Sequence, residues 1–337
     1  MQTEAAVLWD RESWSVEPIE LDAPKEGEVL IKLAASGMCH SDEHLLTGDM
    51  PVPLPVIGGH EGAGVVEEVG SGVTGLVPGD HVVLGFVPAC GKCPPCATGH
   101  SNLCDVGGIL MTGKQLDGTV RHHARGQDVS TMVCLGTFAP YTVVNQASCV
   151  KILDDIPLDK ACLVGCGVTT GWGSSVYAAG VRPGDNVAVI GIGGIGASAV
   201  QGARLAGAEM IFAIDPVALK RELAPSFGAT HVASSVDEAK ALVEQETWGR
   251  GCDKVICAMG VGSGAMMQSI LDLTAKRGRV VVTNIHSDIP KLLKLYRDGQ
   301  LDLDSMITTT YKLGDINQGY QDMRDGVNIR GVLVYDD

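Results

Sequence analysis

The sequence predicts an α/β protein with a β-rich N-terminal domain followed by a doubly wound parallel sheet. Its 337 residues suggest two domains. Short alternating segments at 5–9 and 28–33 indicate β-strands in the first part. From residue 184 onward, short apolar strands alternate with helical segments. That order is typical of a parallel sheet with helices on its faces.

Four cysteines lie close together, at Cys90, Cys93, Cys96 and Cys104. The two-residue gaps let successive thiolates face one point, and the longer gap closes a tetrahedron. This spacing predicts a structural zinc site. An iron–sulfur cluster is an alternative, because C-x2-C-x2-C also begins cluster motifs, and a disulfide knot is less consistent with the pattern. Four thiolates leave no open position for a substrate, so any catalytic site must lie elsewhere.

A second group of possible metal ligands is spread along the first half of the chain. Residues 39–44 hold a cysteine, two histidines, a serine and two acids. The pair His60-Glu61 stands among glycines before an apolar strand, and Cys166 also lies among glycines. Taken alone, Cys166 is more typical of a small core residue. The thiolate and imidazoles upstream favour a ligand role for His60.

A glycine-rich turn at 191–196 joins an apolar strand at 186–190 to a helical segment at 197–206. Its G-x-G-x-x-G pattern allows a tight turn and a close approach of backbone to a pyrophosphate at the helix N-terminus. The next strand ends at Asp215, where a carboxylate can accept both ribose hydroxyls. This acid would repel a 2′-phosphate and therefore predicts NAD, although Lys220 and Arg221 are close enough to keep NADP open.

The charge and the distribution of apolar residues indicate which partners and which compartment to expect. A net charge of −15 argues against nucleic acid. The N-terminus lacks the basic start and apolar run of a signal peptide, and the longest apolar stretch, 187–200, is too short to span a bilayer. We therefore expect a cytoplasmic protein with reduced thiols and no membrane partner. Residues 105–131 are predicted to form a polar loop in which His122 and His123 are solvated.

Together these segments resemble the zinc-dependent alcohol dehydrogenases of the medium-chain dehydrogenase/reductase family, over essentially the whole chain. The strongest motif is G-H-E-x2-G-x5-G-x2-V, matched by Gly59, His60, Glu61, Gly64, Gly70 and Val73. The resemblance implies a GroES-like catalytic domain of residues 1–167 and 287–337, with the structural zinc lobe at 90–104. It implies a Rossmann NAD-binding domain of residues 168–286 between these two parts.

The resemblance also implies two zinc ions per chain, one structural and one catalytic. The catalytic zinc would be held by Cys39, His60 and Cys166. Glu61 matches the carboxylate beside that zinc. Ser41 matches the hydroxyl that takes the alcohol proton, and His44 matches the far end of the proton relay, which is reached through the cofactor ribose.

The remaining site residues implied by the resemblance concern NAD and the substrate. The NAD contacts would be His40, Thr170, Gly191, Gly193, Gly194, Ile195, Gly196, Asp215, Lys220 and Arg330. Phe86 matches an aromatic residue of the substrate pocket. Many members carry arginine where this chain has His40, and a neutral imidazole would hold the phosphates less strongly.

The implied activity is zinc-dependent hydride transfer between a primary alcohol, or its aldehyde, and NAD. Within the family, loop 105–131 resembles the long-loop enzymes and the thiol-dependent formaldehyde dehydrogenases, so oxidation of a hydroxymethyl–thiol adduct is an alternative. The sequence is also similar to the actinobacterial nitrosoaniline-dependent (NDMA-dependent) branch, in which NAD stays bound. A catalytically inactive zinc- and NAD-binding protein fits poorly, because the ligands and relay residues are present.

One segment of the family pattern is missing. After residues 279–286 the family has roughly thirty more residues, which line the nicotinamide and supply a strand that pairs subunits. Here His286 runs directly into Ser287. The resemblance implies a homodimer or homotetramer, and the missing segment includes the strand that pairs subunits in that assembly.

Overall fold

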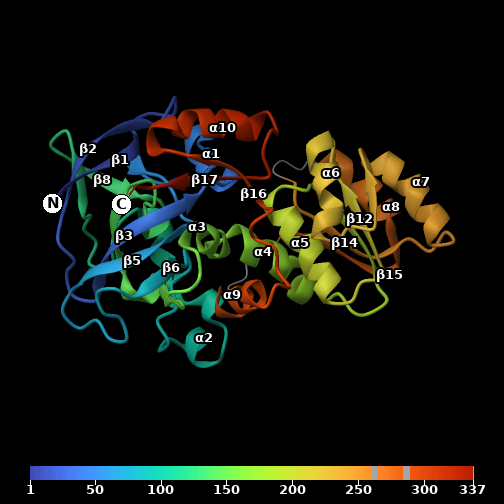
Figure 1. Cartoon of the computed structure of the whole chain (residues 1–337), viewed down its shortest axis with the longest axis horizontal. Helices are drawn as coiled ribbons and strands as arrows, with labels where there is room; N and C mark the ends of the chain where they lie inside the picture. Colours follow the sequence, from blue (N-terminus) through green and yellow to red (C-terminus); the bar gives the residue numbers. More distant parts are fainter. Residues whose placement is uncertain (260–263, 284–288, 337) are drawn as a thin grey trace.

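The computed structural model describes residues 1–259, 264–283 and 289–336 (Figure 1). Two lobes lie side by side along the long axis, and both chain ends lie in the β-rich lobe. The chain passes from this lobe into the parallel-sheet lobe and returns at its end. The suspected gap at residues 286–287 falls outside the described residues.

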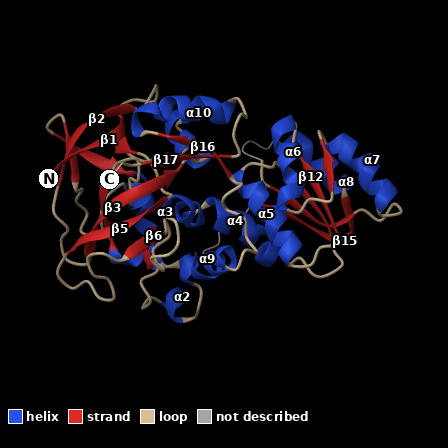
Figure 2. Cartoon of the chain, in the orientation of Figure 1, coloured by secondary structure: helices blue, strands red, loops and turns tan. Residues whose placement is uncertain are grey.

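The β-rich lobe contains a closed barrel and a larger sheet (Figure 2). The barrel strands are β1 (Gln2–Leu8), β2 (Ser15–Leu21), β7 (His122–Ala124), β8 (Gln127–Thr131) and β4 (Val56–Ile57). The sheet follows the order β10 (Cys149–Lys151), β6 (His81–Leu84), β5 (Gly62–Val69), β3 (Glu28–Gly37), β17 (Arg330–Val334) and β16 (Ile307–Tyr311), with β9 (Tyr141–Asn145) also on β3. β17 pairs antiparallel with β3, so the end of the chain completes a sheet begun near its start.

The second lobe is built on a parallel sheet, as the alternation of strands and helices predicts. Its order is β13 (His231–Ala233), β12 (Met210–Ile214), β11 (Asn186–Ile190), β14 (Cys252–Cys257) and β15 (Thr274–Val282). The central strand β11 is buried along its whole length, as expected for a parallel strand covered on both faces. The covering helices include α5 (Gly194–Leu205), α6 (Ala218–Phe227), α7 (Val236–Glu246) and α8 (Met267–Asp272).

The other α-helices are α1 (His40–Thr47), α2 (Pro94–Ala97), α3 (Leu158–Ala161), α4 (Gly167–Gly173), α9 (Ile289–Arg297) and α10 (Ile316–Arg324). The short 3-10 segments are η1 (Ser101–Leu103), η2 (Asp105–Thr112), η3 (Met132–Cys134), η4 (Gln146–Ser148), η5 (Cys162–Gly165), η7 (Gly264–Met266) and η8 (Leu313–Asp315), and η6 (Ser174–Ala179) is a π-helical turn.

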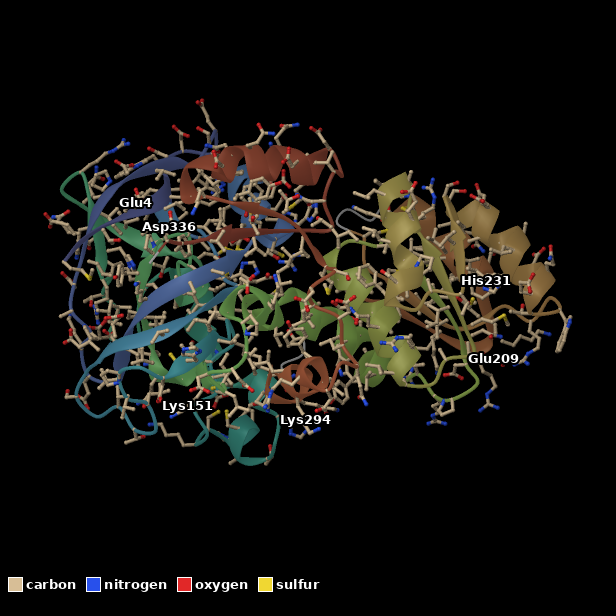
Figure 3. All side chains as sticks on the ribbon, viewed as in Figure 1. Glu4, Lys151, Glu209, His231, Lys294 and Asp336 are labelled. Carbon is tan, nitrogen blue, oxygen red and sulfur yellow. The ribbon has the colours of Figure 1, made fainter. Side chains whose placement is uncertain are left out.

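One hydrophobic core runs through the junction of the two lobes. It joins Val83 and Leu163 of the β-rich side to Val187 and Ala199 of the parallel-sheet side, and Leu292 of α9 is part of it. In Figure 3, Glu4, Lys151 and Asp336 lie on the β-rich lobe, whereas Glu209 and His231 lie on the parallel-sheet lobe. The continuous core holds the junction together, and the site described below lies there.

The prediction of a polar loop over 105–131 is wrong. This segment contains η2, β7 and β8, and β7 pairs with β2 in the barrel. His122 is buried, whereas His123 is half-buried between two aspartates. Burial alternates within β7, where His122 and Ala124 are buried and His123 is half-buried, so His122 points inward.

Within the described residues, no helix is long and apolar enough to cross a membrane.

Candidate metal and cofactor site

Three backbone segments bring four possible ligands together in the β-rich lobe. The ligand atoms of Cys39, His60, Glu61 and Cys166 lie within 4.8 Å of one another, and all four residues are buried. Cys39 caps the start of α1, His60 and Glu61 lie just before β5, and Cys166 lies between η5 and α4. Buried thiols and an imidazole meeting at one point are a typical set of zinc ligands.

The ring of His60 is oriented for metal binding. Its Nδ1 lies 3.1 Å from Oδ1 of the fully buried Asp42, which also accepts the N–H of Gly59 at 2.9 Å. The other ring nitrogen, Nε2, is buried without a hydrogen-bond partner in the described part of the chain. An orphaned imidazole nitrogen beside two thiols fits a zinc ion, and a carboxylate behind the ring is the usual outer partner of such a ligand.

Charge in the cluster also suits a cation. The Cys166 thiol donates to Cys39, which lowers the pKa of Cys39 well below its ordinary value and raises that of Cys166. Burial disfavours a charged ring, but Asp42 and Cys39 raise the pKa of His60 well above its ordinary value. The lowered pKa of Cys39 favours its thiolate, which is the form of cysteine that binds metals.

Glu61 faces away from water toward a cation of the last strand. Its Oε1 accepts the N–H of Gly167 at 3.0 Å, and its Oε2 pairs with Arg330. Arg330 also donates to the carbonyl of Met38 at 3.2 Å. Burial raises the pKa of Glu61 and opposes the effect of Arg330.

The second predicted metal site is also assembled. Sγ atoms of Cys90, Cys93, Cys96 and Cys104 lie within 4.8 Å of one another. Backbone N–H groups of Lys92 and Cys93 lower the pKa of Cys90 to about 6. Four thiols at this spacing fit a closed tetrahedral zinc site.

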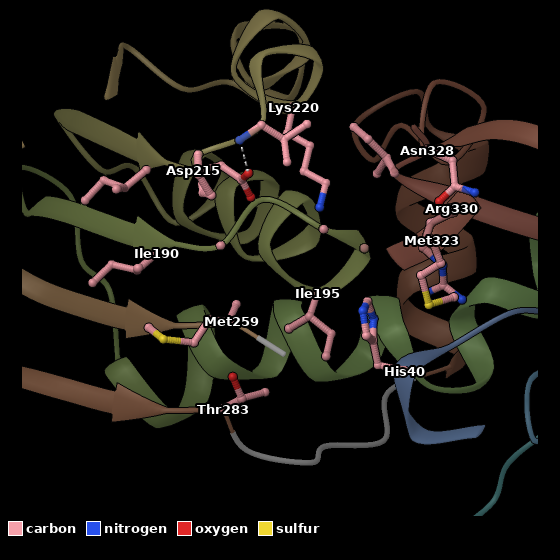
Figure 4. Close-up of a pocket in the computed structure, with 18 of the residues that line it drawn as sticks. His40, Ile190, Ile195, Asp215, Lys220, Met259, Thr283, Met323, Asn328 and Arg330 are labelled. Atoms are coloured by element: carbon pink, nitrogen blue, oxygen red, sulfur yellow. Dashed lines mark hydrogen bonds between the residues drawn. The ribbon is translucent and has the colours of Figure 1, made fainter. Parts of the chain in front are cut away.

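A cavity of about 770 Å³ runs from Cys39 along the glycine-rich turn to Asp215. His40 and Ile195 lie on one side of it, and Asp215 and Lys220 lie farther along (Figure 4). A side chain at position 194 would collide with Arg330, since a Cβ there would lie 2.2 Å from its Cδ. The turn therefore presents bare backbone at a helix N-terminus, which fits a dinucleotide pyrophosphate.

Asp215 organises the turn as well as lining the cavity. Its Oδ2 accepts the N–H of Ile192 at 2.7 Å and its Oδ1 the N–H of Val217 at 2.9 Å. In the sequence, Arg221 is one reason to keep NADP as an alternative cofactor. In the structure it donates to the backbone carbonyl of Asp215 at 2.7 Å. This guanidinium is therefore engaged, and the carboxylate faces the cavity.

The predicted proton carriers line the same cavity. Ser41 Oγ lies 3.7 Å from Sγ of Cys39, and His44 lies one helical turn farther along α1. His40 begins that helix, and partial desolvation lowers the pKa of its imidazole below the ordinary value.

Three other predicted residues, Phe86, Thr170 and Gly196, are not part of the cavity lining. The ring centroid of Phe86 is 6.0 Å from that of His60, edge-on. Thr170 is buried on α4, and its hydroxyl has no hydrogen-bond partner among the described residues. Gly196 is covered as well, because a Cβ there would lie 1.7 Å from the carbonyl oxygen of Gly191.

Sequence reasoning missed the role of Asp42. It lies three residues after Cys39, and its Oδ2 accepts the Cys39 N–H at 3.3 Å. An acid at this position of a helix N-terminus is itself a capping signal. Its second role, behind His60, depends on a contact across 18 residues.

The fold and this site define a medium-chain, zinc-binding dehydrogenase, and comparison with known proteins agrees. Residues 25–154 match the alcohol dehydrogenase GroES-like domain, and residues 194–307 match the zinc-binding dehydrogenase domain. The chain belongs to the zinc-dependent alcohol dehydrogenase family.

Two relatives cover nearly the whole chain. Alcohol dehydrogenase B of Mycobacterium tuberculosis is 49% identical over 372 positions, covering 100% of this chain and 99% of the relative. The NDMA-dependent alcohol dehydrogenase of Amycolatopsis methanolica is 46% identical, with 99% of each chain covered. The first alignment is 35 positions longer than the 337 residues of this chain, so the relative has segments without a counterpart here.

Solved structures show the same fold. An alcohol dehydrogenase zinc-binding domain protein from Burkholderia ambifaria matches with a TM-score of 0.90 and 32% identity, covering 100% of both chains. Benzyl alcohol dehydrogenase from Acinetobacter calcoaceticus matches with a TM-score of 0.89 and 29% identity, again over 100% of both chains. These matches confirm a GroES-like domain combined with a Rossmann domain.

Proposed function

We propose that this chain is an NAD-dependent zinc enzyme that interconverts primary alcohols and aldehydes. The observation that carries the proposal is the position of Cys39. It belongs to the buried ligand cluster and also lines the cavity that runs to Asp215. A metal-bound substrate and a nicotinamide cofactor would therefore meet at one end of that cavity.

The proposed chemistry divides between bound groups and protein residues. When bound, zinc would act as a Lewis acid toward the alcohol oxygen and NAD would accept the hydride. Cys39, His60 and Cys166 would hold the metal, with Glu61 beside it. Cys90, Cys93, Cys96 and Cys104 would hold the structural ion.

The alcohol proton would be carried away by two side chains of α1, Ser41 and His44. Ser41 is the hydroxyl nearest the ligand cluster on that helix, so its Oγ would accept the alcohol proton. His44 would receive that proton at the far end of the relay, with the ribose of the cofactor between them. Both residues line the cavity, which supports this route.

The cofactor would lie along the glycine-rich turn. The backbone of 191–196, with His40 and Arg330, would face the pyrophosphate. Asp215 would accept the ribose hydroxyls and repel a 2′-phosphate. Lys220 would contact the same ribose, Thr170 would lie near the nicotinamide, and Phe86 would line the substrate side.

The relative named as NDMA-dependent motivates a first test for resident cofactor. Desalted protein without added NAD receives a primary aromatic alcohol, and reduced-nicotinamide absorbance is followed. A burst of one equivalent per chain indicates resident NAD, whereas steady turnover only after NAD is supplied indicates an exchangeable cofactor. If no reduced-nicotinamide absorbance appears in either condition, despite two zinc ions per chain, the proposal is contradicted and the thiol-adduct alternative is favoured.

Ser41→Ala tests the relay. We expect turnover to fall by about 10²-fold or more, while zinc and NAD remain bound, because a proton carrier is lost without a ligand. Ser234→Ala, which alters another hydroxyl on the cavity wall, is the matched control. Full activity of Ser41→Ala at neutral pH would contradict the relay assignment.

We also propose domain limits of 1–167 with 287–337 for the catalytic part and 168–286 for the NAD-binding part. The return of β17 to β3 supports this division. A homodimer or homotetramer in the cytoplasm completes the proposal, and light scattering of the purified protein tests the assembly.

A further inference from the structure

The segment that follows α1 bends back onto His44. The helix ends at Gly48, whose φ of 85° turns the chain sharply. The N–H groups of Gly48 and Met50 donate to the carbonyl of His44 at 3.1 and 3.0 Å. This loop brings the Asp49 carboxylate to the histidine ring, with Oδ2 3.3 Å from Nδ1.

Asp49 is itself fixed and ionised. Thr47 Oγ1 donates to the same Oδ2 at 2.6 Å. The Thr47 hydroxyl and, next, the His44 ring lower the pKa of Asp49 below its ordinary value. An ionised carboxylate only accepts hydrogen bonds, so Nδ1 of His44 must carry the proton in this contact.

The other ring nitrogen is then the basic one. In a neutral imidazole one nitrogen donates and the other accepts, and the hydrogen bond at one nitrogen selects the tautomer. Within the described residues, no hydrogen bond engages Nε2 of His44, and the ring lines the cavity. The side chain of Asp49 is 69% exposed and thus in contact with bulk water.

We infer that Asp49 is a positioning residue of the proton relay, which keeps the His44 proton on Nδ1 and leaves Nε2 as the base facing the cavity. This inference rests on the proposed function. His44 gains one proton at Nε2, becomes an imidazolium paired with Asp49, and then releases that same proton from Nε2 to water, which reaches the ring because its side chain is 40% exposed. The ring returns to its starting state with no other group changed.

Neighbouring charges are engaged elsewhere. Arg11 lies beside Gly48 and donates to the carbonyl of Leu45 at 2.6 Å. Glu43, on the same helix, pairs with Arg324 of α10. Partial desolvation lowers the pKa of His40, one turn earlier, which disfavours positive charge on that ring. Asp49 is therefore the carboxylate that reaches this ring within the described part of the chain.

The first experiment reads the tautomer. Full-length protein with ¹⁵N-labelled histidine is compared with Asp49→Ala, and a His44→Gln variant assigns the His44 signals. We expect the neutral ring of the parent protein to carry its proton on Nδ1, and Asp49→Ala to shift the ring toward the Nε2–H form. An unchanged Nδ1–H signal in Asp49→Ala overturns the inference.

The chain offers a matched control. Asp128 makes a similar surface pair with His123, at 3.0 Å from Nδ1, and its side chain is 78% exposed. Asp128→Ala removes the same charge from the β7–β8 hairpin of the barrel. We expect it to leave the His44 signals and turnover unchanged; a matching loss in this control would mean a general charge effect and would overturn the inference.

The second experiment reads turnover in the zinc-loaded enzyme. We expect Asp49→Ala to lower kcat for alcohol oxidation about tenfold with KM unchanged, less than the loss of a whole proton carrier. Added imidazole should restore part of the rate, because it replaces the poorly oriented base. Undiminished kcat in Asp49→Ala overturns the inference.

Failure of the proposed function can be distinguished from failure of the inference about Asp49. If the parent protein oxidises no alcohol with NAD, the proposed function fails, and the relay role of Asp49 fails with it. The tautomer measurement would still show whether Asp49 holds the His44 ring.

Discussion

At the scale of the residue, Asp42 joins the candidate ligand cluster of Cys39, His60, Glu61 and Cys166 to the helix beside it. One carboxylate accepts the N–H groups of Cys39 and Gly59 and supports the ring of His60. Asp42 is fully buried, so its carboxylate has no contact with water and depends on these protein partners for its hydrogen bonds. Two ligands from separate segments thus depend on one side chain.

Asp42→Asn should weaken zinc binding at the proposed site of Cys39, His60 and Cys166. An amide cannot accept at both oxygens, so His60 loses its orientation or one backbone N–H loses its partner. We expect zinc affinity of this site to fall about 10–100-fold. Zinc retained per chain against a graded chelator measures it, and the structural ion provides an internal reference. Retention of both ions at parental chelator concentrations would contradict this role.

At the scale of the element, β7 explains why 105–131 is not a loop. The strand is only three residues long, yet it pairs with β2 and β8 and closes the barrel. A three-residue strand carries little periodicity, and its partner β2 lies far away in sequence. The cost of the pairing is a buried imidazole at His122.

Because His122 is buried, we expect the free energy of unfolding to fall in mild acid. Burial lowers its pKa from 6.5 to about 3 in the folded protein. Between these values the unfolded chain binds a proton that the folded chain does not. His122 therefore does not lower the free energy of unfolding above pH 6.5. As the pH falls from 6.5 toward 3, the free energy of unfolding decreases by up to about 1.4 kcal/mol per pH unit.

Urea unfolding of parent and His122→Gln from pH 7.5 to 5.5 checks this expectation. The variant should lose less stability over this interval, because its side chain does not titrate. His123→Gln, on the adjacent residue of the strand, is the control. Equal pH slopes for parent and His122→Gln would refute the assignment.

At the scale of the whole molecule, Arg330 ties the last strand to both parts of the site. It pairs with Glu61, 269 residues earlier, and packs against Gly194 of the glycine-rich turn. Both members of the pair are buried. A buried charge that loses its partner is costly, whereas the loss of both charges costs much less.

Arg330→Met should therefore destabilise the protein by about 3–5 kcal/mol, and addition of Glu61→Gln should recover part of that loss. Urea midpoints of the zinc-loaded parent, both single variants and the double variant form a complete cycle. Additive effects would show that the two side chains do not act as a pair.

The sequence by itself determined the local chemistry of this protein. The four-cysteine spacing, the G-x-G-x-x-G turn followed by Asp215 and the alternation of strands and helices are short-range patterns, because metal spacing, turn geometry and helix periodicity act over a few residues. The family resemblance, rather than spacing, assigned Cys39, His60 and Cys166 to one metal.

Only the tertiary structure decided which groups meet across long separations. The pairing of Glu61 with Arg330, the support of His60 by Asp42 and the burial of His122 depend on how distant segments pack. Asp49 lay outside the predicted site because its role depends on the left-handed turn at Gly48 that folds it onto His44. Sequence patterns specify the elements, whereas burial and long-range pairing determine which side chains are desolvated together.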